Sequence, residues 1–122
     1  AVVAVPGGAL ATWSRYDGHE YRIVIARFDG RKWSSPAWAG PAGASEPAFS
    51  RAPGADAGRP TLLTFVHAHP RGWGVLELSA SGRVLRQGAV ESTASSRPAL
   101  AVLPGGRVRL RWAADESELE LH

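Results

Sequence analysis

The feature that most constrains the fold of this chain is an internal repeat. Residues 1–13 (AVVAVPGGALATW) match residues 98–112 (PALAVLPGGRVRLRW). Each copy is an apolar run, a Pro-Gly-Gly turn, an alternating run and a final Trp. Pro6 and Pro104 leave room between them for two units of about 49 residues, so a middle unit should begin near Pro47.

The second halves of the units also match. Residues 21–33 (YRIVIARFDGRKW) align without gaps on residues 73–85 (WGVLELSASGRVL). Asp29-Gly30 and Ser81-Gly82 are predicted to be tight hairpin turns, because Gly adopts a positive φ without steric cost. In the middle unit, residues 52–59 are predicted to form a longer turn between two strands.

These patterns predict an all-β fold made of antiparallel four-stranded units, with strands A to D in each. Pro or Gly interrupts every segment that is long enough to form a helix. Four-stranded units of about 40–50 residues are typical of β-propeller blades. We therefore expect a single β-repeat domain over residues 1–122, with propeller-type units at 1–45, 46–96 and 97–122. The last unit lacks its fourth strand, which leaves about two and three-quarter blades. A β-sandwich is the alternative.

One stretch carries a family resemblance. Residues 26–36 (ARFDGRKWSSP) resemble the C–D turn of sialidase-type (BNR, Asp-box) propeller repeats, whose pattern is Ser/Thr-x-Asp-x-Gly-x-Thr-Trp. Asp29, Gly30 and Trp33 are the matching residues, although Asp29 and Gly30 are adjacent and the Ser/Thr is missing. The resemblance implies a propeller fold, a ligand site among the B–C and D–A loops, and a secreted or periplasmic location. In that family the Asp-box is a structural turn, so the resemblance does not imply sialidase activity.

Composition excludes several classes of protein. The chain has no Cys, so it has neither disulfides nor thiolate metal sites. It has no apolar run of about 18 residues, so no membrane partner is expected. The net charge is only +3, and acidic residues lie among the arginines without a dense basic cluster. Nucleic-acid binding is therefore not expected.

The B–C and D–A loops supply the candidate ligand-binding residues. The B–C loops read SRYDGHE, HAHPRG and AADES, and they concentrate charged, aromatic and imidazole side chains. The Pro- and Gly-rich stretch at residues 36–47, interpreted as a D–A loop, adds an aromatic residue that has no counterpart in the other units. The candidates are Arg15, Tyr16, Asp17, His19, Trp38, His67, His69 and Arg71.

A metal site is the alternative for part of this set. His67 and His69 share a strand face and would meet one metal ion, with His19 or Asp17 from a neighbouring unit completing the site. Pro70, however, indicates that the strand is already ending, and exposed loop histidines are the more common outcome. We therefore expect no metal and no other cofactor, and no catalytic residue is assigned.

The repeat also predicts which aromatic residues form the core. Positions that are large in both copies should be buried. The aligned large positions are Trp13 with Trp112, Tyr21 with Trp73, and Trp33 with Leu85.

A stripe of arginines marks the last long strand. Arg107, Arg109 and Arg111 alternate with apolar residues. Pairing with the following strand would place Arg111 opposite Glu118 and Arg109 opposite Glu120, and each such pair contributes about 0.2–1 kcal/mol. We interpret the stripe as a cross-strand ladder rather than as an anion or nucleic-acid site.

The sequence therefore predicts a non-enzymatic recognition module that binds a glycan or a protein through its B–C and D–A loops. Two alternatives remain: part of a sialidase-like glycoside hydrolase completed by other blades or chains, and a structural or assembly fragment. A closed propeller needs about four blades at minimum. Self-association or a missing partner segment is therefore expected to complete it.

Overall fold

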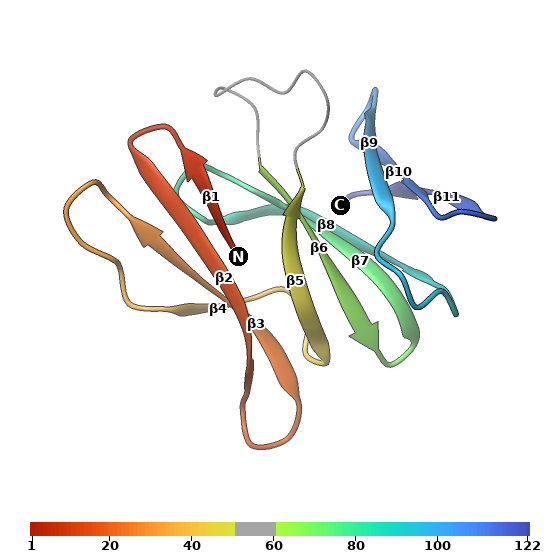
Figure 1. Cartoon of the computed structure of the whole chain (residues 1–122), viewed down its shortest axis with the longest axis horizontal. Coiled ribbons are helices and arrows are strands. Elements are labelled where there is room, and N and C mark those ends of the chain that lie inside the picture. The colour runs from red at the N-terminus through yellow and green to blue at the C-terminus, as the bar shows by residue number, and fades with distance from the viewer. Residues whose placement is uncertain (51–60) are drawn as a thin grey trace.

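The structure is a computed structural model that describes residues 1–50 and 61–122. These residues form three antiparallel sheets of 4, 4 and 3 strands, which confirms the predicted all-β class (Figure 1). Every sheet is a meander of consecutive strands. The turn expected over residues 52–59 lies outside the described residues. No described segment is a helix long and apolar enough to cross a membrane.

Each sheet follows the chain in order. The first sheet contains β1 (Val2–Val5), β2 (Gly8–Tyr16), β3 (Tyr21–Phe28) and β4 (Ala37–Ala39). The second contains β5 (Ala44–Ser50), β6 (Thr61–Ala68), β7 (Arg71–Leu78) and β8 (Val84–Glu91). The third contains β9 (Ala99–Leu103), β10 (Arg107–Arg111) and β11 (Glu116–Glu120).

The two predicted Gly turns are confirmed. Gly30 has a φ of 99° and Gly82 has a φ of 87°, the left-handed region in which glycine is favoured. In the first turn the Asp29 carboxylate accepts hydrogen bonds from the backbone N–H groups of Arg31 and Lys32. The Asp29 side chain therefore holds the turn that leaves β3.

The first core lies between the first and second sheets. On one side are Leu10, Ile23 and Ile25, which are at most 5% exposed. On the other side are Phe65 and Leu76 with their buried neighbours. Burying an aliphatic or aromatic side chain of this size contributes about 1.5–3 kcal/mol, so this contact is a major source of stability.

A second core lies on the opposite face of the second sheet. Trp73 and Val75 from β7 pack with Val108 and Leu110 from β10. Trp73 Nε1 donates a hydrogen bond of 3.1 Å to the backbone oxygen of Ala94, in the segment between β8 and β9. The second sheet is therefore sandwiched, and the connection to the third sheet is fastened to the core.

The charge ladder exists, but its predicted register is wrong. Arg109 lies opposite Glu118 rather than Glu120. Arg111 lies opposite Glu116 rather than Glu118. The register is shifted because the turn is shorter than expected: β10 ends at Arg111 and β11 already begins at Glu116. Arg109 Nη2 lies 3.2 Å from a carboxylate oxygen of Glu118, so the structure supports the ladder interpretation.

The prediction that every recurring large position is buried is only partly confirmed. Trp73 and Trp112 are 4% and 8% exposed. The prediction is wrong for four other positions, whose exposed fractions range from 39% to 54%: Trp13, Tyr21, Trp33 and Leu85. A repeat identifies which positions are large, but burial also requires another sheet to cover that face. Trp13 and Trp33 lie on the face of the first sheet that points away from the second.

The first prediction concerns Gly74, which pairs with Phe65 across the β6–β7 ladder. A Cβ at residue 74 would collide with the Phe65 ring. We expect Gly74→Ala to lower the free energy of unfolding by about 1–3 kcal/mol through overpacking, measured by urea denaturation followed by Trp fluorescence. Gly74→Ala should lower the free energy of unfolding less when it is made together with Phe65→Leu than when it is made alone, because Leu leaves more room for the added methyl group. Unchanged stability in Gly74→Ala would contradict this packing.

Candidate functional site

One edge of the molecule gathers the loops that were predicted to bind a ligand. Figure 1 shows the β2–β3 and β6–β7 turns at the same lower edge. The β4–β5 loop joins them, because Gly43 donates its backbone N–H to Tyr21 and accepts a hydrogen bond from the N–H of Ala68, at 2.9 and 3.1 Å. Backbone hydrogen bonds therefore fix the relative positions of these three loops.

The same edge continues toward the third sheet as an open cleft of about 640 Å³. The Ser92 N–H donates a hydrogen bond of 3.1 Å to the Arg71 oxygen, which ties the β8–β9 connection to β7. The cleft lies between the β6–β7 turn, this connection and the β10–β11 turn. It is lined by Pro70, Arg71, Glu91, Ser92, Thr93, Ala94, Trp112, Ala114 and Asp115.

The chemistry of the cleft is mixed. Arg71 supplies a cation that forms no ion pair with another described residue. Glu91 and Asp115 supply carboxylate acceptors, and both are exposed. Hydroxyl groups and apolar side chains complete the lining. The cleft therefore offers hydrogen-bond donors and acceptors beside an apolar surface.

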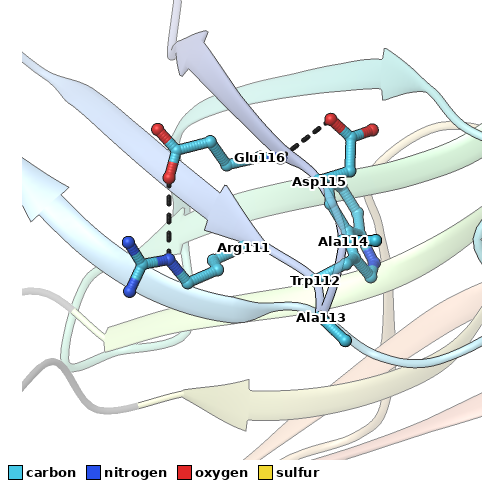
Figure 2. A pocket seen from close by; sticks show the side chains of 6 residues that line it. All are labelled: Arg111, Trp112, Ala113, Ala114, Asp115 and Glu116. Carbon is cyan, nitrogen blue, oxygen red and sulfur yellow. Dashed lines mark hydrogen bonds and ion pairs between the residues drawn. The ribbon is translucent and has the colours of Figure 1, made fainter.

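A second open cleft lies on the other side of the β10–β11 turn, also with a volume of about 640 Å³. Figure 2 shows the side chains that line it. The turn is closed by a 2.7 Å hydrogen bond from the Trp112 N–H to the Asp115 oxygen, and Asp115 Oδ1 accepts from the N–H of Glu116 at 2.9 Å. Trp112 also donates its Nε1–H to Ser96 at 2.9 Å. These bonds hold the wall that the two clefts share.

Asp17 has a structural role in its turn. Its Oδ1 accepts hydrogen bonds from the backbone N–H groups of His19 and Glu20, at 2.8 and 2.9 Å. The hydrogen bond from Glu20, and to a smaller extent the one from His19, lowers the pKa of the Asp17 carboxyl group below its ordinary value of 3.8. Bonds from the N–H groups of Lys32 and Arg31 lower the pKa of Asp29 in the same way. The Asp17 oxygen that caps the turn is thus already engaged.

The two histidines of the β6–β7 turn do not meet a third metal ligand. His67 Nδ1 lies 3.0 Å from the backbone oxygen of Pro70, so this nitrogen carries the proton and donates. His69 is exposed at the turn. Within residues 1–50 and 61–122, no group of three or more His, Cys, Asp or Glu side chains could hold a metal ion. The alternative in which His19 or Asp17 completes a metal site is therefore wrong for this structure.

The other predicted residues lie in two further places. Tyr16 packs against Tyr21 beside the β2–β3 turn, with ring centroids 5.6 Å apart. Arg15 lies on the outward-facing side of the first sheet. The expectation that Trp38 belongs to a loop is wrong, because it lies on β4. Ala37, Ala39, Gly40 and Ala42 around Trp38 give no strand pattern, so the sequence did not predict a strand here. Pairing with β3 stabilises this short edge strand.

Of the eight predicted site residues, only Arg71 lines the cleft. Sequence reasoning named the β10–β11 turn but assigned no ligand-binding residue to it. It also missed residues 91–94, which lie at the end of β8 and in the connection that follows. These residues lie in a D–A connection beside a B–C loop, and that position could have identified them as candidates. Trp112 was missed because it was assigned to the core, where most of its surface does lie.

Comparison of the chain with protein-family models, with curated proteins and with solved structures finds no match.

The second prediction concerns acid sensitivity. Because the pKa values of Asp17 and Asp29 are lower in the fold, folding favours their ionised forms. Their contribution to stability is complete above about pH 5 and is lost as the pH falls below about 4, through the lowered pKa values. Asp17→Asn/Asp29→Asn should flatten the acid-side fall of the urea midpoint, since Asn keeps an acceptor oxygen but does not titrate. An equally steep fall in this variant would contradict the assignment.

Proposed function

We propose that this chain is a non-enzymatic recognition module that binds a glycan in the cleft between its second and third sheets. The observation that carries the proposal is the composition of that cleft. It combines the cation of Arg71, the carboxylates of Glu91 and Asp115, two hydroxyl side chains and an apolar surface that includes Trp112.

This combination suits the chemistry of a sugar. A sugar hydroxyl donates one hydrogen bond and accepts others. The carboxylates of the cleft can accept from it, and the guanidinium group can donate to it. The C–H faces of a pyranose ring are apolar and are matched by Pro70, Ala94 and the exposed part of Trp112. The open shape of the cleft admits an internal segment of a chain as well as its end. Arg71, with no ionic partner among the described residues, favours a glycan that carries a carboxylate or sulfate group.

We further propose that the three sheets are consecutive units of a propeller-type array. The support is their packing: each sheet is a meander, and the sheets contact one another face to face in chain order (Figure 1). In such an array the B–C and D–A loops of successive units meet at one edge. The hydrogen bonds of Gly43 and Ser92 link the loops at that edge of the molecule.

The third prediction tests ligand binding. A glycan array should identify acidic glycans that bind the chain, and titration calorimetry should then give their affinity. Arg71→Ala should weaken binding by about ten-fold or more, because a charge-assisted hydrogen bond contributes roughly 1.5–3 kcal/mol. Arg83→Ala is the matched control, since Arg83 is an exposed arginine in the β7–β8 turn, at the other end of β7.

Two outcomes would contradict the proposal. Equal losses in Arg71→Ala and Arg83→Ala would indicate nonspecific attraction to surface cations. Turnover of a fluorogenic sialoside by the chain would overturn the non-enzymatic assignment and favour the glycoside hydrolase alternative.

A further inference from the structure

Within residues 1–50 and 61–122, one face of the first sheet has no other sheet packed on it. Its inner face packs on the second sheet through Leu10, Ile23 and Ile25. Cross-strand register assigns the alternate residues to the opposite side, here called the outer face. The outer face consists of Val2, Ala4, Ala9, Ala11, Trp13, Arg15, Arg22, Val24, Ala26, Phe28, Trp33 and Trp38.

The outer face is apolar and exposed. Val2 is 67% exposed, and Trp13, Trp33 and Trp38 are 39%, 48% and 45% exposed. These four side chains account for half of the exposed large hydrophobic residues of the described chain. An exposed apolar surface of this kind indicates an interaction site.

The tryptophans form an ordered surface. Trp13 on β2, Val24 on β3 and Trp38 on β4 are cross-strand neighbours in a single row. The two tryptophans are thus two strand spacings apart, about 10 Å. Val24 is only 2% exposed, because the larger side chains beside it enclose it. Trp33 extends the surface by packing on Phe28, with ring centroids 5.3 Å apart.

The polar part of the outer face is confined to one end. Arg15 and Arg22 are cross-strand partners, next to the β2–β3 turn. The guanidinium carbon of Arg22 lies 5.3 Å from the centroid of the Trp38 ring, a cation–π contact. A partner that covers the tryptophans therefore needs an apolar surface that leaves this cationic end in water.

The opposite end of the molecule does not offer such a surface. The outward side of the third sheet carries the ladder of Arg107, Arg109 and Arg111 with Glu116 and Glu118. Stacking two copies head to tail would press this ladder against the tryptophans. Removing these ion pairs from water costs free energy that their mutual attraction only partly returns.

We propose that the outer face is the interface of a two-fold symmetric dimer of this chain. A two-fold axis sets the same surface against itself, so apolar side chains meet apolar side chains. In an antiparallel arrangement the Arg15–Arg22 pairs lie at opposite rims of the interface. The exposed parts of three Trp side chains supply roughly 300 Å² per copy, and the rest of the face brings two copies to about 1,000 Å², the lower bound for a specific interface.

This interface has a precedent within the chain. The second sheet buries both of its faces against other sheets, through Phe65 and Leu76 on one side and Trp73 and Val75 on the other. Apart from Arg15 and Arg22 at one end, the outer face is apolar, as those covered faces are. The dimer would extend the face-to-face stacking of sheets by one more contact, which makes the first sheet buried on both sides as well.

The fourth prediction is the solution mass of the chain. Light scattering at about 100 µM should give twice the 12.9 kDa chain mass, with dissociation to monomers on dilution. Trp13→Glu and Trp38→Glu should each raise the dissociation constant by about 100-fold or more, because each places a charge in the centre of the interface. Acrylamide quenching of Trp fluorescence should increase on dilution of the unmodified chain and stay constant for the variants.

Leu85→Glu is the matched control. Leu85 is 39% exposed on β8, so the change adds the same charge at a similar exposure away from the outer face. It should leave the dimer intact, and circular dichroism should show that all three variants keep the β-fold. The variants also leave the cleft lined by Arg71 unaltered, so dimerisation and glycan binding can fail separately.

Three results would overturn the dimer proposal. The first is a monomer at every concentration tested. The second is a dimer that Trp13→Glu and Trp38→Glu leave intact. The third is assembly beyond two copies, which would indicate head-to-tail stacking. A shift of Trp fluorescence that requires an added glycan, in a chain that stays monomeric, would instead assign the outer face to a ligand.

Discussion

The second sheet is buried on both of its faces, and this arrangement sets the positions of the other two sheets. Phe65 and Leu76 point toward the first sheet, whereas Trp73 and Val75 point toward the third. Because alternate residues of a strand point to opposite faces, β6 and β7 have to be apolar almost throughout. Gly74 completes the packing by leaving room for the Phe65 ring. Without this sheet, neither hydrophobic core would form.

The stack of three sheets has two chemically different ends. The first sheet ends in exposed tryptophans, and the third ends in paired arginines and glutamates. The charged end is stable in water, because its arginine and glutamate side chains pair with one another and remain hydrated. Exposing the apolar end to water costs free energy. This asymmetry explains why the molecule would associate through one face only, while its loops remain free to bind a ligand.

The ligand site was harder to predict than the fold. Alternation, the repeat and the Gly turns predicted antiparallel strands, and these exist. The expected loop residues instead separate into the β2–β3 turn, the outer face and the β6–β7 turn, and only Arg71 reaches the cleft. Asp17 holds its own turn, and His67 is bonded to Pro70. Loop composition indicated which side chains carry chemistry, but backbone hydrogen bonds and the packing angle of the sheets determined where those side chains lie.

The sequence by itself determined the strand content, the Gly-dependent turns and the two-sided apolar character of the second sheet, because these follow from local sterics and from the period of side-chain alternation. Only the tertiary structure decided three other features: the ladder register in which Arg109 lies opposite Glu118, the placement of Trp38 on an edge strand, and the exposure of Trp13. Each depends on which surface lies opposite a residue. That surface comes from residues distant in the chain, so the local pattern does not contain it.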